Sequence, residues 1–328
     1  MNTNILVSSK EIEKKRFIIG THDGIFHSDE VVACAILALL HSGEQIEIVR
    51  SKDVSYLVEK GADIMVDVGG GFYDHHKPEG NGKRENDVPY ASAGIVWREF
   101  GRELICKCYN YLYNVKLNSK DHLTLYIFEE IDEKIIQEVD KEDNGISTSI
   151  HSFSFIPSFL PIYDSNYCDF DKGFKLALNA TIGILEHEIF STISRFKIIL
   201  DIHYMIKNNS IDNRILEVPS QIFPWLEPIV SHNSKHTFNT WKYIDFVIFP
   251  YPSGGWAAQC VPPSLEKKFD QRVPFPKEWA GQTGKLAEIS GVEDATFCHN
   301  GCFFVRASSK EGVIALCRKA FLDYEDSL

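Results

Sequence analysis

The chain lacks several features that would assign it to a common class of protein. Its 328 residues contain no apolar run that could cross a bilayer, since the longest clean one, Val31–Leu40, falls well short of the roughly 20 residues needed. Residues 1–16 show no apolar core with a cleavage pattern, and none of the eight cysteines forms a C-x-x-C pair. We therefore expect no membrane segment, no signal peptide and no structural zinc site, and reduced, buried thiols in a cytoplasmic protein.

A basic excess is also missing, because the formal net charge is −12. Proteins that grip long duplex DNA through many phosphates usually have the opposite balance. Any nucleic-acid substrate is therefore expected to be held locally, with bound cations supplying positive charge.

Histidine and aspartate residues are instead concentrated in three clusters. The turn Tyr73–Lys77 follows the apolar run Ala62–Val68, a second cluster is Thr21–Glu30, and a third is Val139–Gly145. Each cluster alone could be a solvated turn or a strand end bonded to backbone. Because all three follow apolar, strand-like runs, and strand carboxyl ends form the ligand crevice of open α/β sheets, we predict that they converge on a polynuclear metal site.

The first half of the chain alternates strand and helix signals, which is typical of parallel strands with helices on the faces. Apolar runs predict strands at Phe17–Gly20, Gln45–Arg50 and Ala62–Val68. Helical periodicity predicts helices at Ser28–His41, capped by Ser28 or Asp29, and at Val54–Lys60, Ala91–Tyr113 and Asp121–Glu138.

The second half predicts a different organisation. Residues 146–172 are expected to form a long irregular loop over the site, and Gly173–Asn208 a long helix with one apolar stripe. Short strands at 215–218, 246–249 and 295–297 precede a final helix at Lys310–Asp323. We expect a parallel-sheet domain at 1–172, a connecting helix at 173–211 and a smaller α+β domain at 212–328.

Six motifs occur in a fixed order: THDGIFHSDE, VDVGGGFYDHH, PYASAGIVWREFG, VDKEDNGI, SGGWAAQCVPP and FCHNGCFF. Together they resemble the melanocyte proliferating gene 1 (Myg) exonuclease family of the DHH phosphoesterase superfamily, over nearly the whole chain. The resemblance implies a DHH-type parallel-sheet catalytic domain flanked by helices, a C-terminal substrate-binding domain, and a cleft between them that holds two divalent metal ions.

Carried over by motif position, the resemblance implies a set of metal ligands: His22, His27, Asp29, Asp67, His75 and Asp140. Asp67 would bridge both ions, His76 would face the scissile phosphate and Asp74 would orient the histidines. Many superfamily members have Asp at the position of His27, so the identity of the metal ion is left more open. Asp23 and Asp143 remain alternative ligands.

Substrate contacts are predicted in the smaller domain. The turn Ser253-Gly254-Gly255-Trp256 is similar to a glycine-rich phosphate-binding turn, since adjacent glycines let backbone N–H groups approach a phosphate. Trp256 could stack a base or serve packing, and Arg272 could bind a phosphate or form a surface ion pair. His299 is open between a turn residue and a cleft residue.

Carboxylates combined with imidazoles suit Mn²⁺, or Mg²⁺, better than zinc. Two such ions can clamp the attacking and leaving oxygens of a phosphoryl displacement. We expect a divalent-metal-dependent phosphoesterase, specifically a 3′-to-5′ exonuclease on short RNA or single-stranded nucleic acid, and leave a homodimer open. A pyrophosphatase, a small-nucleotide phosphohydrolase and a non-catalytic nucleotide- or RNA-binding module are the alternatives.

Overall fold

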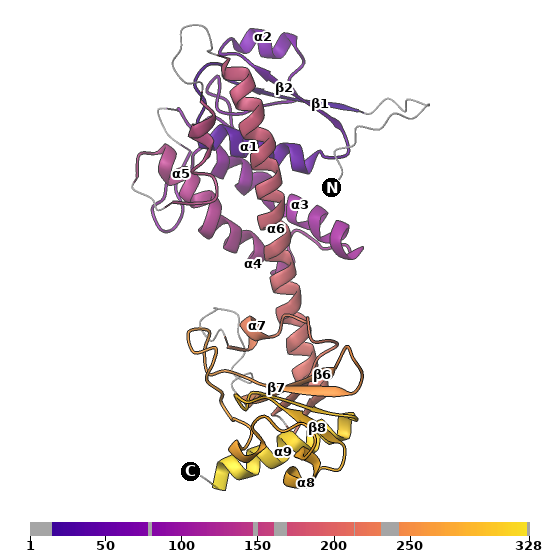
Figure 1. The fold of residues 1–328 in the computed structure, drawn as a ribbon. Helices are drawn as coiled ribbons and strands as arrows, with labels where there is room; N and C mark the ends of the chain where they lie inside the picture. Colours follow the sequence, from indigo (N-terminus) through magenta and orange to yellow (C-terminus); the bar gives the residue numbers. More distant parts are fainter. Residues whose placement is uncertain are drawn as a thin grey trace. The chain divides into compact units, whose positions relative to one another are not determined.

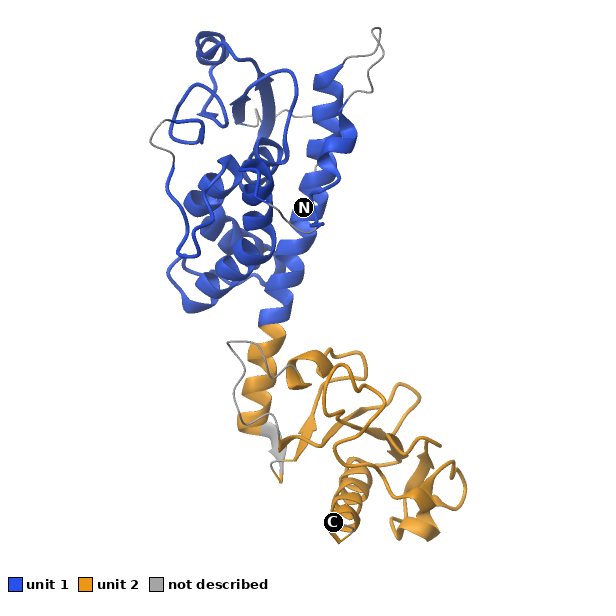
Figure 2. Cartoon of the chain, turned by 90° about the vertical axis from the view of Figure 1, so that its left-hand side faces the viewer, with its two compact units in different colours: residues 1–196 blue, residues 197–328 orange. Residues whose placement is uncertain are grey.

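The computed structural model describes residues 15–77, 81–146, 150–160, 169–212, 214–230 and 243–326. Its contacts divide the chain into two compact units, Met1–Phe196 and Lys197–Leu328, which Figure 2 shows in different colours. Each unit has its own hydrophobic core and is described by itself.

The first unit contains a parallel sheet. Strands β1 (Arg16–Thr21), β2 (Gln45–Arg50) and β3 (Ile64–Met65) are arranged in the order β2-β1-β3, with both pairs parallel. The three predicted strands are confirmed, but the third is shorter than Ala62–Val68. Its ladder stops because Asp67 has a left-handed backbone (φ 53°), which an extended strand cannot include.

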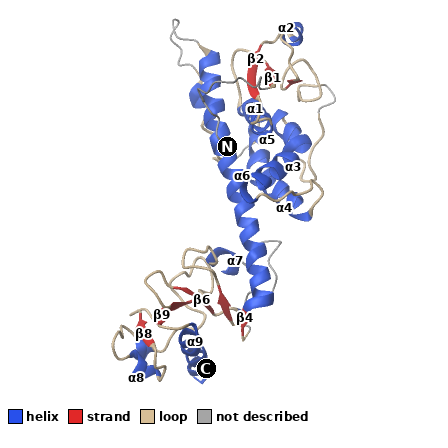
Figure 3. Cartoon of the chain, turned by 90° about the vertical axis from the view of Figure 1, so that its right-hand side faces the viewer, coloured by secondary structure: helices blue, strands red, loops and turns tan. Residues whose placement is uncertain are grey.

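Helices and loops make up the rest of this unit (Figures 1 and 3), and the helical elements before residue 160 are given first. They are α1 (Ser28–Leu40), α2 (Val54–Glu59), α3 (Ser92–Tyr113), α4 (His122–Ile131), a π-helical segment (Asp132–Ile136), α5 (Gln137–Asp143) and a 3₁₀ turn (Ile156–Phe159). Helix α1 is buried along its whole length and packs against β1 and α3, as expected of a helix that is apolar on every side.

Two predictions about this region need correction. The helix expected to end near Glu138 continues through the π-helical segment to Asp143. The third acidic cluster therefore lies on α5 and not at a strand end. Of the loop predicted over the site, residues 147–149 and 161–168 lie outside the described residues.

The long predicted helix is confirmed as α6 (Phe170–Asn209). Its apolar stripe contributes Phe174 and Leu185 to the core of the first unit and Ile199 and Ile202 to a core cluster of the second. One helix thus belongs to both units, which is why a separate connecting segment at 173–211 stays a prediction.

The second unit is built on a mixed six-stranded sheet in the order β4-β5-β6-β7-β9-β8. The strands are β4 (Ser210–Ile211), β5 (Ile215–Glu217), β6 (Phe246–Pro250), β7 (Trp256–Cys260), β8 (Ala295–Cys298) and β9 (Phe304–Ala307). Only the β5–β6 pair is parallel among these described strands. The helices are α7 (Leu226–Val230), a 3₁₀ turn (Lys277–Trp279), α8 (Leu286–Ser290) and α9 (Lys310–Asp326).

Helix α9 packs against β6, β7, β8 and β9, so this unit has the α+β character that the sequence predicted. Within the described residues every cysteine is free. No helix among them combines the length and apolar character needed to span a bilayer.

Candidate metal centre

The loop between β1 and α1 brings two histidines to one buried carboxylate. His27 is the N-cap of α1, and both carboxylate oxygens of Glu30 accept its backbone N–H, at 2.9 and 2.8 Å. The Oε1 atom of Glu30 also lies 3.0 Å from His22 Nε2. The cap is therefore His27, not Ser28 or Asp29, because Glu30 three residues later completes a capping box.

Glu30 was missed as a site residue, although its spacing from His27 was a visible signal. A glutamate three residues after a helix N-cap reaches back to the cap in this way. Its side chain is fully buried, and a buried carboxylate needs partners. The two histidine contacts supply them.

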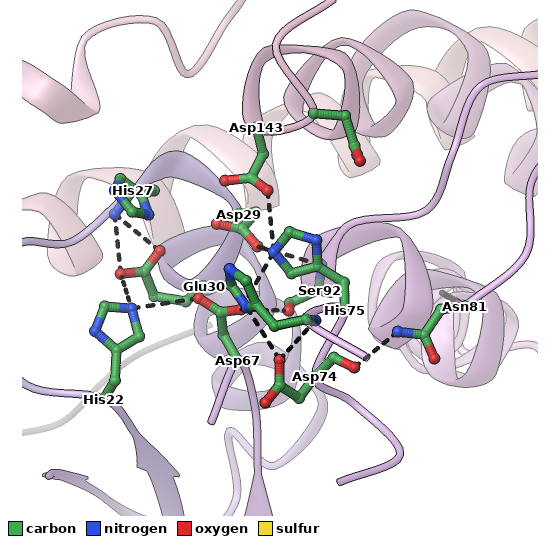
Figure 4. Close-up of polar contacts among 12 residues, drawn as sticks. His22, His27, Asp29, Glu30, Asp67, Asp74, His75, Asn81, Ser92 and Asp143 are labelled. Carbon is green, nitrogen blue, oxygen red and sulfur yellow. Dashed lines mark hydrogen bonds and ion pairs between the residues drawn. The ribbon is translucent and has the colours of Figure 1, made fainter. Parts of the chain in front are cut away.

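Asp67 lies between the two groups of histidines (Figure 4). Its Oδ2 atom is 3.3 Å from His22 Nε2, and its Oδ1 atom is 3.4 Å from His75 Nε2 and 3.3 Å from His76 Nδ1. The left-handed backbone at Asp67 ends the strand and lets Asp67 N–H bond to Tyr73 O at 3.0 Å. The chain thereby returns to the same sheet edge with the histidine pair.

Asp74 holds one histidine of that pair, His76. Its Oδ1 atom accepts the backbone N–H of His76 at 2.9 Å and lies 3.1 Å from His76 Nδ1, while Oδ2 accepts Gly70 N–H at 2.6 Å. The His76 side chain remains 64% exposed. This arrangement fits the orienting role predicted for Asp74 as far as His76 is concerned, and it leaves His76 accessible to a substrate.

On α5 the structure favours Asp143 in place of Asp140. Asp143 Oδ2 lies 3.0 Å from His75 Nε2. Asp140 is fully buried, and its two oxygens accept Gly94 N–H at 2.9 Å and Arg84 Nη1–H at 2.7 Å. The prediction that Asp140 is a ligand does not fit this geometry, because its carboxylate is already occupied by an arginine and a helix N-terminus.

At the N-terminus of α3, one residue, Ser92, donates hydrogen bonds to two carboxylates of the centre. Ser92 N–H donates to Asp29 Oδ2 at 3.2 Å, and Ser92 Oγ–H donates to Asp67 Oδ1 at 3.0 Å. Unpaired N–H groups and the helix dipole favour negative charge at this end of a helix. Ser92 was not identified from the sequence, since a serine at a helix start is common.

The ionisable side chains of the centre strongly shift one another's pKa values. Burial opposes protonation of His22, but the carboxylates of Asp67 and Glu30 outweigh it and raise the pKa of His22 to about 10. Burial and the charges of Asp67, Glu30 and Asp143 raise the pKa of Asp29 well above its usual value. Burial would raise the pKa of Asp67, yet its histidine partners lower it. So many buried carboxylates need a compensating cation.

The donor atoms fit divalent metal ions. Four overlapping groups each place their ligand atoms within 4.8 Å of one another: His22, His27 and Glu30; Asp67, His75 and His76; His27, Asp29 and Asp143; Asp29, Glu30 and Asp67. Among the described residues the buried atoms Asp29 Oδ1, Asp67 Oδ2 and His75 Nε2 form no hydrogen bond of regular geometry, although the last two have the histidine and carboxylate contacts given above. Buried polar atoms of that kind indicate a missing ligand. Asp23 contributes only its backbone oxygen, to His22 Nδ1 at 3.0 Å.

Comparison with known proteins finds the same family that the sequence motifs resemble. A family described as "Uncharacterised protein family (UPF0160)", the MYG1 exonuclease family, matches residues 18–321. A MYG1 protein of Schizosaccharomyces pombe is 31% identical over 93% of this chain and 97% of its own length. The chain belongs to the MYG1 exonuclease family. Other members of this family include the MYG1 exonuclease of Mus musculus, which is 28% identical over 92% of this chain and 83% of its own length.

One solved structure is also similar, RecJ in complex with Mn²⁺ from Thermus thermophilus. It is 12% identical with a TM-score of 0.25, and the match covers 94% of this chain and 52% of RecJ. The MYG1-family chain thus spans about half the length of that protein.

In this member of the MYG1 family, the residues of the second unit that were predicted to contact substrate differ in how well their observed contacts fit that role. Gly254 and Gly255 form a left-handed turn (φ 95° and 74°) between β6 and β7. Arg306 Nη2–H donates to Ser253 Oγ at 3.1 Å and to Gly254 O at 3.2 Å. A guanidinium therefore stands at the turn, but it belongs to Arg306, which the sequence did not single out.

The other predicted contacts have structural partners. Arg272 donates to the backbone oxygens of Ile244 at 2.8 Å and Ile229 at 3.5 Å, so its guanidinium ties chain segments together and does not fit the phosphate contact expected of it. His299 Nδ1 accepts Gly301 N–H at 3.0 Å, as in the turn alternative. Trp256 is half-buried, with Lys310 Nζ 5.4 Å from its ring centre.

Proposed function

We propose that the chain is a divalent-metal-dependent phosphoesterase that shortens RNA or other single-stranded nucleic acid from its 3′ end. One observation carries the proposal: overlapping sets of metal ligands meet at the carboxyl edge of the parallel sheet. The residues are His22, His27, Asp29, Glu30, Asp67, His75 and Asp143. The MYG1 relatives named as exonucleases support the reaction class. The direction of cleavage is what the family resemblance implies.

Two bound ions, Mn²⁺ or Mg²⁺, would supply Lewis acidity and align the reacting oxygens. The protein would hold one ion through His22, His27 and Glu30, and the other through His75 and Asp143, with Asp67 and Asp29 between them. His76, exposed and oriented by Asp74, would donate a hydrogen bond to a phosphate oxygen as negative charge develops.

The Ser253–Trp256 turn of the second unit would offer a phosphate contact of its own. The N–H of Gly254 already donates to Tyr251 O at 2.9 Å, so the phosphate contact would come from two cations at the turn or its tryptophan, Arg306 and Lys310. A few local phosphate contacts, in place of a broad basic surface, would suit an acidic protein.

The experiment incubates purified protein and Mn²⁺ with short RNA, short DNA and pyrophosphate in parallel, using RNA labelled at either end. Stepwise shortening of 5′-labelled RNA, with no release of a 5′-terminal nucleotide, is the expected result. Cleavage of pyrophosphate alone would favour the phosphohydrolase alternative, and nucleic-acid binding without hydrolysis the binding module.

Asp67→Asn is the control for this experiment, because it keeps the size of the side chain, removes its charge and is expected to be inactive. Asparagine tolerates the left-handed backbone of residue 67 but cannot place a charge between two ions. Metal assistance contributes several kcal/mol, so hydrolysis should fall by about 100-fold or more, while the metal-free variant stays folded. Full activity at saturating Mn²⁺ would rule out the two-metal reaction.

A further inference from the structure

Arg50 lies at the end of β2, paired with Thr21 at the end of β1, and its side chain is only 5% exposed. A guanidinium stays protonated and offers no lone pair, so Arg50 is no metal ligand. A buried guanidinium beside a metal-binding loop needs partners that hold it in place, and those partners come from two elements far apart in sequence.

The first partner is the metal-binding loop itself. Arg50 Nη2–H donates to Gly24 O at 2.9 Å, and its guanidinium lies 5.8 Å from the ring centre of Phe26. Both residues stand between His22 and His27. Glu30 contacts the loop at its ends, through His22 Nε2 and His27 N–H. Arg50 adds a hydrogen bond in the middle of the loop, beside the packing of the buried Phe26 ring.

The second partner is the start of α6. Arg50 Nη1–H donates to Asp171 Oδ1 at 2.6 Å, and the guanidinium lies 4.5 Å from the ring centre of Phe174. Phe174 in turn packs edge-to-face on Phe26, with ring centres 5.6 Å apart. Asp171 is 76% exposed, so water screens the ion pair and the two buried rings are the firmer anchor.

We propose that Arg50 is a positioning residue that fixes the loop between His22 and His27 against α6, and so sets the separation of the two imidazoles that would share a metal ion. The two ring centres are 6.2 Å apart in the structure. Lysine could not replace arginine here, because a single ammonium cannot bond Gly24 O and Asp171 together while stacking on a ring. The proposal rests on the metal centre proposed above, but its test does not need hydrolysis.

The test titrates metal-free protein with Mn²⁺, followed by calorimetry and by the Mn²⁺ electron paramagnetic resonance signal. Arg50→Ala and Arg50→Lys should weaken Mn²⁺ binding by about 10- to 100-fold, the usual effect of removing a group that orients metal ligands. Lys175→Ala, which removes an exposed cation next to Phe174 on α6, should bind as the wild type does.

Guanidinium ion at millimolar concentration should restore part of the Mn²⁺ affinity of Arg50→Ala and none of that of Arg50→Lys, a response that a general loss of stability would not give. If Arg50→Ala does not fold, Arg50→Lys carries the test, because it keeps the charge. Wild-type Mn²⁺ affinity in the folded Arg50 variants, or an equal loss in Lys175→Ala, would overturn the proposal. If the wild type binds Mn²⁺ but cleaves no oligonucleotide, the proposed substrate fails while the role of Arg50 is still decided.

Discussion

Two aspartates one turn apart on α5 have different contacts, and a pair of alanine variants tests whether they also have different roles. Asp143→Ala removes a contact of His75 and should weaken Mn²⁺ binding while leaving the unfolding free energy of the metal-free protein nearly unchanged. Asp140→Ala removes a fully buried acceptor of Arg84 and of Gly94 N–H. Because Arg84 keeps its ion pair with Asp132, the free energy of unfolding should fall by about 1–3 kcal/mol. Urea denaturation and Mn²⁺ titration of both variants make the comparison, and the reverse pattern would restore Asp140 as the ligand.

The raised pKa of His22 predicts that metal binding releases a proton. In the metal-free protein the pKa is about 10, against an ordinary value of 6.5, so His22 must lose a proton before its nitrogen can bind an ion. Mn²⁺ affinity should therefore rise between pH 6.5 and pH 10, by up to about tenfold per pH unit for one released proton. Calorimetry in buffers of different ionisation enthalpy counts the protons.

The same shift sets the sign of the pH dependence of stability. Because the folded state holds the His22 proton more tightly than the unfolded state, the stabilisation is complete below pH 6.5 and is lost as pH rises toward 10. The metal-free protein should thus unfold more easily across the window in which it binds Mn²⁺ more tightly. A melting temperature that rises with pH in that window would contradict this assignment of charge.

At the scale of elements, the start of α3 is where the site and the fold depend on each other. A Cβ atom at Gly94 would lie 1.9 Å from Asp140 Oδ2, and Gly94 N–H bonds to the same carboxylate. Gly94→Ala should therefore destabilise the protein by about 1–3 kcal/mol, although alanine favours helix. Gly183→Ala in α6, where a Cβ meets nothing within 4 Å, is the control and should stabilise it by about 0.5–1 kcal/mol. Chemical denaturation of both variants measures the difference, and equal shifts would show that the space at Gly94 is not needed.

The elements themselves were largely predictable, because β1, β2, α1, α3 and α6 carry strong apolar periodicity or short apolar runs. The end of the third strand was not, since the left-handed turn at Asp67 depends on its bond to Tyr73. Nor could the sequence choose between Asp140 and Asp143, which are one helical turn apart and therefore share a face. That choice depends on Arg84, 56 residues away from Asp140, and no local pattern records such a contact.

The whole molecule is acidic, with a net charge of −12, and part of that charge is buried around one site. Asp29, Glu30 and Asp67 are all less than 5% exposed. Without cations their mutual repulsion opposes folding of the first unit. The described part of the second unit contains two core clusters and no residue of this site, so metal binding should stabilise the two units unequally.

Calorimetric unfolding with and without Mn²⁺ tests that inequality. An ion that binds only the folded first unit adds about 2.7 kcal/mol of stability at roughly 100 times its dissociation constant, so the transition of that unit should move upward while the other stays in place. Hydrogen exchange assigns the transitions, through peptides from β1 and α1 on one side and β6 to β9 on the other. The Asp67→Asn variant should largely lose the Mn²⁺ shift and keep both transitions. Because α6 contributes to the cores of both units, a single transition that moves as a whole is the contrary result, and it would mean that the helix couples the two units into one cooperative fold.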